Sequence, residues 1–168
     1  MKDITNYSVT ERSVLAVLRI LIGWHILYEG FSKLLILNWS SASFLVESKW
    51  ILKGFANWIM THPAVLNTVD FLNIWGLIAI GLGLILGLFT RQAAISGAVL
   101  LLIYYLVNPP LTGLEYSLPA EGNYLIVSKT LIEVAALVVL AVFPAGSFAG
   151  IDMFIAKARK NNKNKREE

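Results

Sequence analysis

Residues 69–89, VDFLNIWGLIAIGLGLILGLF, form an apolar run of 21 residues with one charged side chain, Asp70. A helix needs about 20 residues to cross the roughly 30 Å hydrocarbon layer of a membrane. Three further apolar runs lie at residues 14–37, 91–108 and 124–143. The four runs predict an all-α fold, a membrane four-helix bundle within residues 1–156. A basic tail at residues 157–168 follows it.

The composition excludes several classes of protein. Apolar residues make up 57% of the 168 residues, charged residues only 15%, and the mean hydropathy is +0.66. Ordinary soluble domains are roughly 45–50% apolar and 25% charged. The chain is therefore not expected to be disordered, to bind nucleic acid or to be an ordinary soluble enzyme. It has no cysteine and two histidines, so no thiol chemistry, iron–sulfur cluster or other metal site is expected.

The basic residues predict how the helices are oriented in the membrane. Six of the 14 Lys and Arg residues lie between Lys157 and Arg166, and Arg91 lies in the turn between the second and third runs. The loop at residues 111–122 has no basic residue, and the segment at residues 38–68 has two. Cytoplasmic loops carry an excess of Lys and Arg. The pattern predicts a multi-pass protein of a bacterial-type inner membrane, with both termini in the cytoplasm.

Residues 43–60 form neither a span nor an ordinary loop. Aromatic and aliphatic residues such as Phe44, Trp50 and Trp58 alternate with Glu47, Lys53 and other polar residues in a roughly helical rhythm. This pattern predicts an additional interfacial amphipathic helix between the first two spans. Two interpretations stay open: a lid over the mouth of the bundle, or a packing element at the membrane surface.

Ionisable residues occur where lipid is expected. They are Arg19, His25, Glu29 and Lys33 in the first span, and Lys129 and Glu133 in the fourth. Such a side chain costs several kcal/mol in a membrane unless it is paired or hydrated. The four residues of the first span fall within an arc of about 120° on one helix face.

Their depths predict specific pairs. Glu29 and Lys129 each lie about 6 Å to the outer side of their helix midpoints, and His25 and Glu133 lie at the midpoints. We therefore predict that Glu29 contacts Lys129, that His25 contacts Glu133, and that all six residues form one buried polar network. Arg19 and Lys33 lie nearer the two membrane faces, so contact with the headgroups is an alternative for these two. The network either fixes helix register or lines a cavity for a ligand or a proton.

Two weaker signals concern a ligand and a partner. Polar residues at the outer ends of the second and third spans predict an outer mouth formed by Asp70, Asn73, Tyr104, Tyr105 and Asn108. Ordinary interfacial placement is the alternative. The spacing of Gly83 and Gly87 favours close helix packing, including a homo-oligomer.

Three segments in order resemble the DoxX/DoxD family of small four-span membrane proteins. They are LRILIGWHILYEGFSKLL (18–35), GLIAIGLGLILGLFTRQAA (76–94) and EGNYLIVSKTLIEVAALVVLAVFPAGSFAGID (121–152). The positions that match are Arg19, Gly23, Gly30, Lys33, Arg91, Lys129 and Glu133. The resemblance implies an association with membrane oxidoreductase systems, including thiosulfate:quinone oxidoreductase.

Two hypotheses for the function follow. In the first, the protein is a quinone-interacting membrane subunit of an oxidoreductase system. Lys129 and His25 donate hydrogen bonds to the quinone, and Glu29 or Glu133 exchanges protons. Electrons then come from a redox partner protein, because no haem, iron–sulfur or flavin site is evident in the sequence. The catalytic residues are unknown. In the second, the protein is a non-catalytic membrane scaffold or small-solute carrier whose charges are structural.

Overall fold

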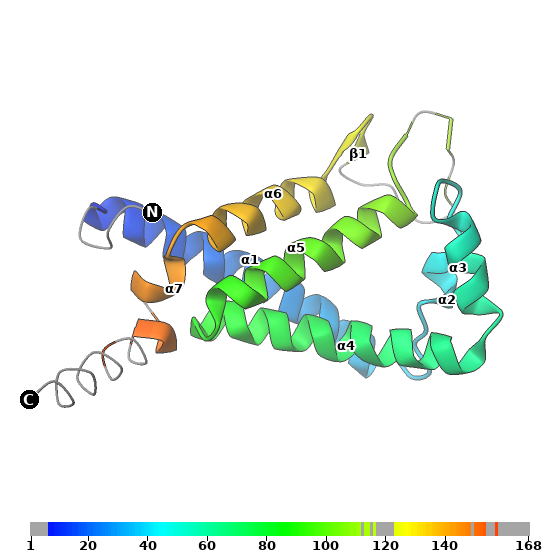
Figure 1. Cartoon of the computed structure of the whole chain (residues 1–168), viewed down its shortest axis with the longest axis horizontal. Helices are drawn as coiled ribbons and strands as arrows, with labels where there is room; N and C mark the ends of the chain where they lie inside the picture. Colours follow the sequence, from blue (N-terminus) through cyan, green and yellow to red (C-terminus); the bar gives the residue numbers. More distant parts are fainter. Residues whose placement is uncertain are drawn as a thin grey trace, which may run out of the picture.

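The computed structural model describes residues 7–111, 113–114, 116, 123–148, 150–153 and 157, with the backbone alone at residues 123, 124, 147 and 148. This part of the chain is helical apart from one two-stranded hairpin (Figure 1). Its elements are α1 (Val9–Leu35), α2 (Ala42–Leu45), α3 (Lys53–Met60), α4 (Pro63–Leu86), α5 (Thr90–Val107), β1 (Asn123–Tyr124), β2 (Val127–Ser128), α6 (Lys129–Val142) and α7 (Ala145–Phe148). The predicted all-α membrane fold is confirmed.

Three of the described helices, α1, α4 and α5, are long and apolar enough to cross a membrane. They fall on the first three predicted spans. The fourth run differs, because the predicted start near Tyr124 lies in the hairpin, where Asn123 pairs with Ser128. Helix α6 starts only at Lys129, where Ser128 caps it by accepting the Leu131 N–H at 3.2 Å. Its 14 residues span about 21 Å, so the fourth crossing stays a prediction.

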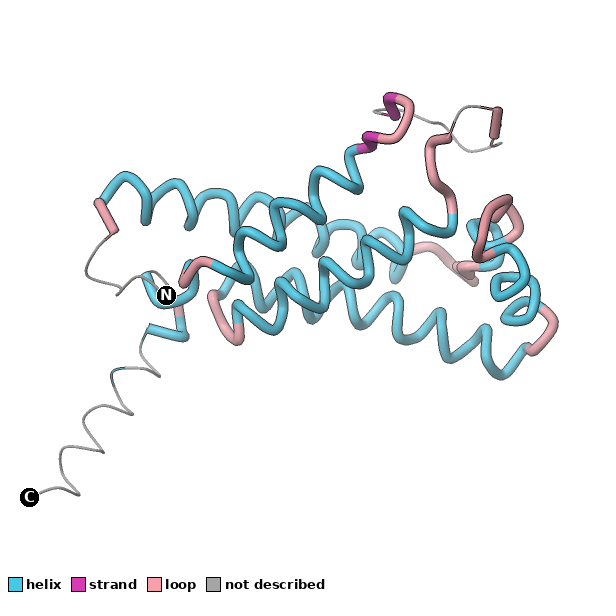
Figure 2. The backbone as a smooth tube through the Cα atoms, turned by 45° about the horizontal axis from the view of Figure 1, so that its top comes forward, coloured by secondary structure: helices cyan, strands magenta, loops and turns pink. Residues whose placement is uncertain are grey.

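The helices pack in sequence (Figures 1 and 2): α1 lies along α4, α4 contacts α5, and α6 follows α5 and crosses α1. The start of α1 and α7 lie at one end, called here the α7 end. Helices α2 and α3 and the hairpin lie at the other, called the α2–α3 end.

Glycines bring α1 and α4 close together. A Cβ on Gly81 of α4 would lie 2.6 Å from the backbone nitrogen of Leu27, and one on Gly23 of α1 would lie 3.1 Å from the Gly81 carbonyl oxygen. Neither space admits a side chain. The core beside this crossing consists of fully buried Leu77, Leu84, Leu137 and Leu140 with their neighbours.

The structure divides the amphipathic helix predicted at residues 43–60 into two short helices, α2 and α3. Between them, Ser48 is 3% exposed, and its hydroxyl donates to the Val107 carbonyl at the end of α5, at 3.2 Å. This contact ties the segment to a distant helix end, whose last carbonyls lack partners within the helix. A continuous helix is lost because the tertiary contact outweighs the local periodicity.

The turn from α4 to α5 is held by the far end of the chain. Gly87 ends α4 with a φ of +65°, which glycine adopts readily. The carboxylate of Asp152 accepts the N–H groups of Phe89 and Thr90, both at 2.9 Å, and so caps the N-terminus of α5. The α4–α5 turn and the residues after α7 thus form one closely packed unit.

Candidate functional site

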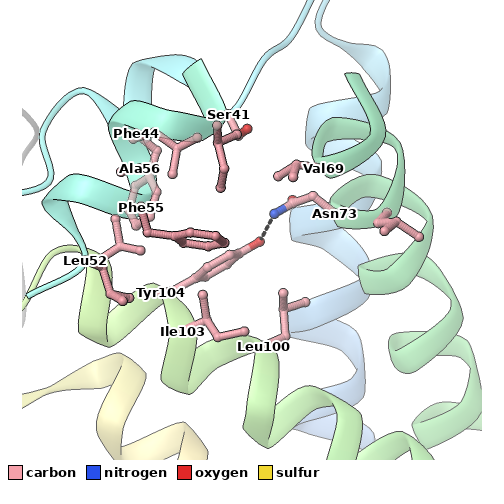
Figure 3. A pocket seen from close by; sticks show the side chains of 14 residues that line it. Ser41, Phe44, Leu52, Phe55, Ala56, Val69, Asn73, Leu100, Ile103 and Tyr104 are labelled. Carbon is pink, nitrogen blue, oxygen red and sulfur yellow. Dashed lines mark hydrogen bonds between the residues drawn. The ribbon is translucent and has the colours of Figure 1, made fainter. Parts of the chain in front are cut away.

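Two adjoining cavities lie at the α2–α3 end. The larger, called here the apolar cavity, has a volume of about 270 Å³ and lies among α2, α3, α4 and α5 (Figure 3). Its apolar lining consists of Phe44, Leu45, Leu52, Phe55, Ala56, Ile59, Val69, Leu72, Leu100, Ile103 and Val107. Ser41, Asn73 and Tyr104 add the polar groups. Concave, mostly apolar spaces with few polar groups are typical of ligand sites.

The smaller, called the polar cavity, has a volume of about 180 Å³. Glu29, Lys33, Trp39 and Ser43 line it, together with four residues that also line the apolar cavity: Ser41, Phe44, Asn73 and Tyr104. The shared residues place the two cavities side by side. Together they form a site with one apolar and one polar end.

The ammonium of Lys33 is the charged centre of the polar cavity. It donates to Asn73 Oδ1 at 3.1 Å and to the Tyr104 hydroxyl at 3.2 Å, and it lies 3.2 Å from Glu29 Oε1. The rings of Trp39 and Tyr104 lie 4.9 and 5.0 Å from it. An ammonium has three donors, so all three are used within the protein. Lys33 thus joins α1 to α4 and α5.

Tyr104 retains a hydrogen-bond donor. Its hydroxyl oxygen accepts from Lys33 Nζ and from Asn73 Nδ2, the latter at 2.6 Å (Figure 3). Among the described residues, no acceptor faces its own hydrogen. A phenolic hydroxyl both accepts and donates. Tyr104 therefore offers one free O–H where the two cavities meet.

Asp70 and Asn108 shape the site from outside it. Asp70 Oδ1 accepts from the Ser41 N–H at 2.8 Å and from its hydroxyl at 2.5 Å. Asn108 Nδ2 donates to the Phe44 carbonyl at 3.2 Å. Both residues hold α2 against the bundle. Of the predicted outer mouth, Tyr105 lies elsewhere, because its hydroxyl donates to Ile126 at the hairpin at 2.8 Å.

The structure places His25 beside Glu133, as their depths predict. His25 Nδ1 and Glu133 Oε1 are hydrogen-bonded, and the side chains are 48% and 22% exposed. The pair therefore lies at the edge of the α1–α6 crossing rather than inside the bundle. Glu29 follows one helical turn along α1 and lines the polar cavity.

The predicted pair of Glu29 with Lys129 is wrong. Glu29 pairs with Lys33 on its own helix, and Lys129 is exposed, with no hydrogen-bond or ion-pair partner among the described residues. Helix α6 follows α5, so it leaves α1 beyond the crossing at His25 (Figure 1). The prediction used only the depth of each residue in the membrane. It fails because α1 and α6 cross and diverge, so residues at equal depth beyond the crossing are far apart.

Arg19 is buried and the Lys33 side chain is only 12% exposed, as predicted for the polar network, and neither takes the alternative position at the surface. Arg19 is 3% exposed and donates from Nη1 to the Ala145 carbonyl at 3.2 Å. Lys33 turns into the polar cavity instead. Both find acceptors inside the protein, which long-range contacts supply and periodicity does not reveal.

Gly83 and Gly87 are used within the chain. A Cβ on Gly83 would lie 3.2 Å from the Ala93 Cβ, and one on Gly150 would lie 2.8 Å from the Gly87 Cα. Both glycines therefore pack within the α4–α5 turn, and the homo-oligomer through them stays a prediction. Trp39 and Ser41 line the site and were not predicted from the sequence. Their only signal was their place next to the aromatic segment at 43–60.

Comparisons with known proteins identify the family. The DoxX family profile matches residues 14–108, more than half of the chain. That segment contains α1 from residue 14 onward, α2 to α5, and every residue that lines the two cavities. Searches of curated proteins and of solved structures gave no match. The chain belongs to the DoxX family.

Proposed function

We propose that this DoxX-family membrane protein binds a quinone in the two joined cavities, as a quinone-interacting subunit of a membrane oxidoreductase system. One observation carries the proposal: an apolar, ring-sized cavity ends at a hydroxyl whose hydrogen has no acceptor among the described residues.

The residues present fit a quinone head. A quinone is a flat ring whose two carbonyl oxygens accept hydrogen bonds, so its site needs apolar walls and at least one donor. Phe44, Leu100 and Val107 supply such walls, and the Tyr104 O–H supplies the donor. This replaces the predicted donors, because His25 is bonded to Glu133 and Lys129 lies outside both cavities.

A bound quinone supplies two-electron, two-proton redox chemistry, with the electrons coming from a partner redox protein. Lys33 and Asn73 both donate to the Tyr104 oxygen, so the hydroxyl keeps its own hydrogen for an acceptor in the cavity. Glu29 accepts from Lys33 and lines the polar cavity, so it is the carboxylate that we propose for proton exchange at this site. His25 and Glu133, one helical turn away, extend the row of ionisable groups toward the helix midpoint.

The second candidate is a non-catalytic scaffold or small-solute carrier. It is favoured by the saturation of Lys33, whose three donors all bind within the protein and join three helices. In this case the cluster stabilises the bundle, and the free O–H has no ligand.

Binding to two matched variants tests the proposal. Purified protein in nanodiscs is titrated with tail-less ubiquinone and menaquinone analogues, followed by calorimetry. Tyr104→Phe removes the free donor, and Tyr105→Phe is the control, because that hydroxyl bonds only the hairpin carbonyl. One hydrogen bond contributes about 1 kcal/mol. We expect Tyr104→Phe to weaken binding about fivefold and Tyr105→Phe to leave it unchanged.

Two results would contradict the proposal. The wild-type protein would fail to bind either analogue, or both tyrosine variants would bind as the wild type does. In either case, a lower unfolding temperature of Tyr104→Phe would support the scaffold role.

A further inference from the structure

Three side chains that line the apolar cavity are also exposed at the protein surface. Phe55 of α3 is 57% exposed, Leu72 of α4 is 62% exposed and Ile103 of α5 is 45% exposed. The cavity wall therefore reaches the surface on this side. The deeper lining residues Ala56 and Leu45 are only 1% and 7% exposed.

Two of these three side chains belong to candidate membrane spans. Leu72 and Ile103 lie on α4 and α5, which are long and apolar enough to cross a membrane. At 1.5 Å per residue, Leu72 lies about 13 Å from the start of α4, and Ile103 lies about 6 Å from the end of α5. Both positions lie within the helices rather than at their tips, so acyl chains would surround them in a membrane that α4 and α5 cross.

The size of the cavity requires an opening for any long ligand. Ligand pockets in proteins are commonly about 300–1,000 Å³, and the apolar cavity is about 270 Å³. It holds one ring but not an isoprenoid tail. The adjoining polar cavity contains Lys33 and Glu29, and burying an alkyl chain against charged groups gives no gain.

We infer that the apolar cavity opens sideways into the bilayer between α4 and α5, under α3, and that this opening, formed by Phe55, Leu72 and Ile103, holds the tail of a lipid-soluble ligand. The inference rests on the proposed function in one respect, the identity of the ring at Tyr104. The ligand then enters from the membrane, with its polar head toward Tyr104 and its tail toward the acyl chains. The substrate class is a tailed quinone.

Ile103→Trp tests the opening, because the larger side chain fills it. The matched control is Val99→Trp, one helical turn earlier on α5, since Val99 is 53% exposed but does not line the cavity. Binding of two ubiquinones is measured in nanodiscs, one without a tail and one with a ten-carbon tail. We expect Ile103→Trp to weaken binding of the tailed quinone at least tenfold and of the tail-less quinone less than twofold. Val99→Trp changes neither.

A second measurement needs no quinone. In vesicles that contain a phospholipid with a diazirine on its acyl chain, illumination should form adducts on the buried residues Leu45 and Ala56. Ile103→Trp should abolish them, and Val99→Trp should not.

The outcomes separate the two proposals. Adducts on Leu45 and Ala56 without binding of either quinone would keep the lateral opening and overturn the proposed function. Binding of both quinones with equal loss in Ile103→Trp, and no adducts on the buried residues, would keep the function and overturn the opening.

Discussion

The two ends of the molecule each receive a cation from α1, yet they use it differently. At the α2–α3 end, Lys33 lies among aromatic side chains and borders a cavity. At the α7 end, Arg19 is 3% exposed and bonds a backbone carbonyl, and a Cβ on Gly150 would lie 3.1 Å from its Nη1. A glycine packs against the cation at one end, and aromatic rings surround the cation at the other. A charged residue within a membrane helix therefore does not by itself identify a binding site.

The first prediction gives an all-or-none result on whether the two ends lie on opposite sides of the membrane. Because the chain has no cysteine, single cysteines can be placed at Thr61, Arg91 and Lys157 and treated with a membrane-impermeant maleimide. The distribution of Lys and Arg predicts labelling of Thr61→Cys in intact spheroplasts, and of Arg91→Cys and Lys157→Cys only after permeabilisation.

The same labelling tests the fourth crossing. If α6 crosses the membrane, Lys157→Cys labels together with Arg91→Cys. Labelling together with Thr61→Cys would show that the short α6 stays on one side.

The second prediction compares the two lysines that the sequence places in one network. Lys33→Met removes three polar contacts and leaves the buried Asn73 without one partner. We expect it to lower the free energy of unfolding by about 2 to 3 kcal/mol and to abolish quinone binding. Lys129→Met should change the free energy by less than about 0.5 kcal/mol, as is usual for exposed side chains. Denaturant unfolding followed by circular dichroism measures both, and equal losses would restore a shared network.

The third prediction compares two aspartates that hold backbone N–H groups, one at each end. Asp152→Ala removes the cap of α5 and should lower the free energy of unfolding by about 1 to 2 kcal/mol, with quinone binding unchanged. Asp70→Ala releases Ser41, which lines both cavities, so it should weaken quinone binding with a smaller loss of stability. Calorimetric binding and unfolding are measured on each variant. Loss of binding in Asp152→Ala alone would reverse the assignment of the two ends.

The elements of the fold that depend on local composition were predictable. Runs of apolar residues indicate α1, α4 and α5. The equal depths of His25 and Glu133 in two antiparallel helices predict their contact, which the structure confirms. Each helix is specified by its own residues. A contact at the crossing of two helices depends on those two helices alone.

The site itself depends on contacts that periodicity does not encode. Lys33 meets Tyr104, which is 71 positions away along the chain, and Ser48 meets Val107, which is 59 away. Asn73 and Tyr104 are polar residues in apolar runs, so their place near the ends of the helices indicates a mouth. Which lysine reaches them depends on how α1 crosses α4 and α5. The glycines of α1 and α4 indicate that the two helices approach closely, but they do not indicate the angle at which the helices cross.

The cap that Asp152 places on α5 also bears on the order in which the chain is assembled. Its carboxylate binds N–H groups 62 and 63 positions earlier in the chain. The residues between them must therefore be synthesised before the α4–α5 turn gains its partner. During synthesis, the N–H groups of Phe89 and Thr90 therefore lack this acceptor until Asp152 has been made. The N-terminus of α5 thus gains this cap only once residue 152 has been made, and a chain halted earlier would leave the Phe89 and Thr90 N–H groups without this partner.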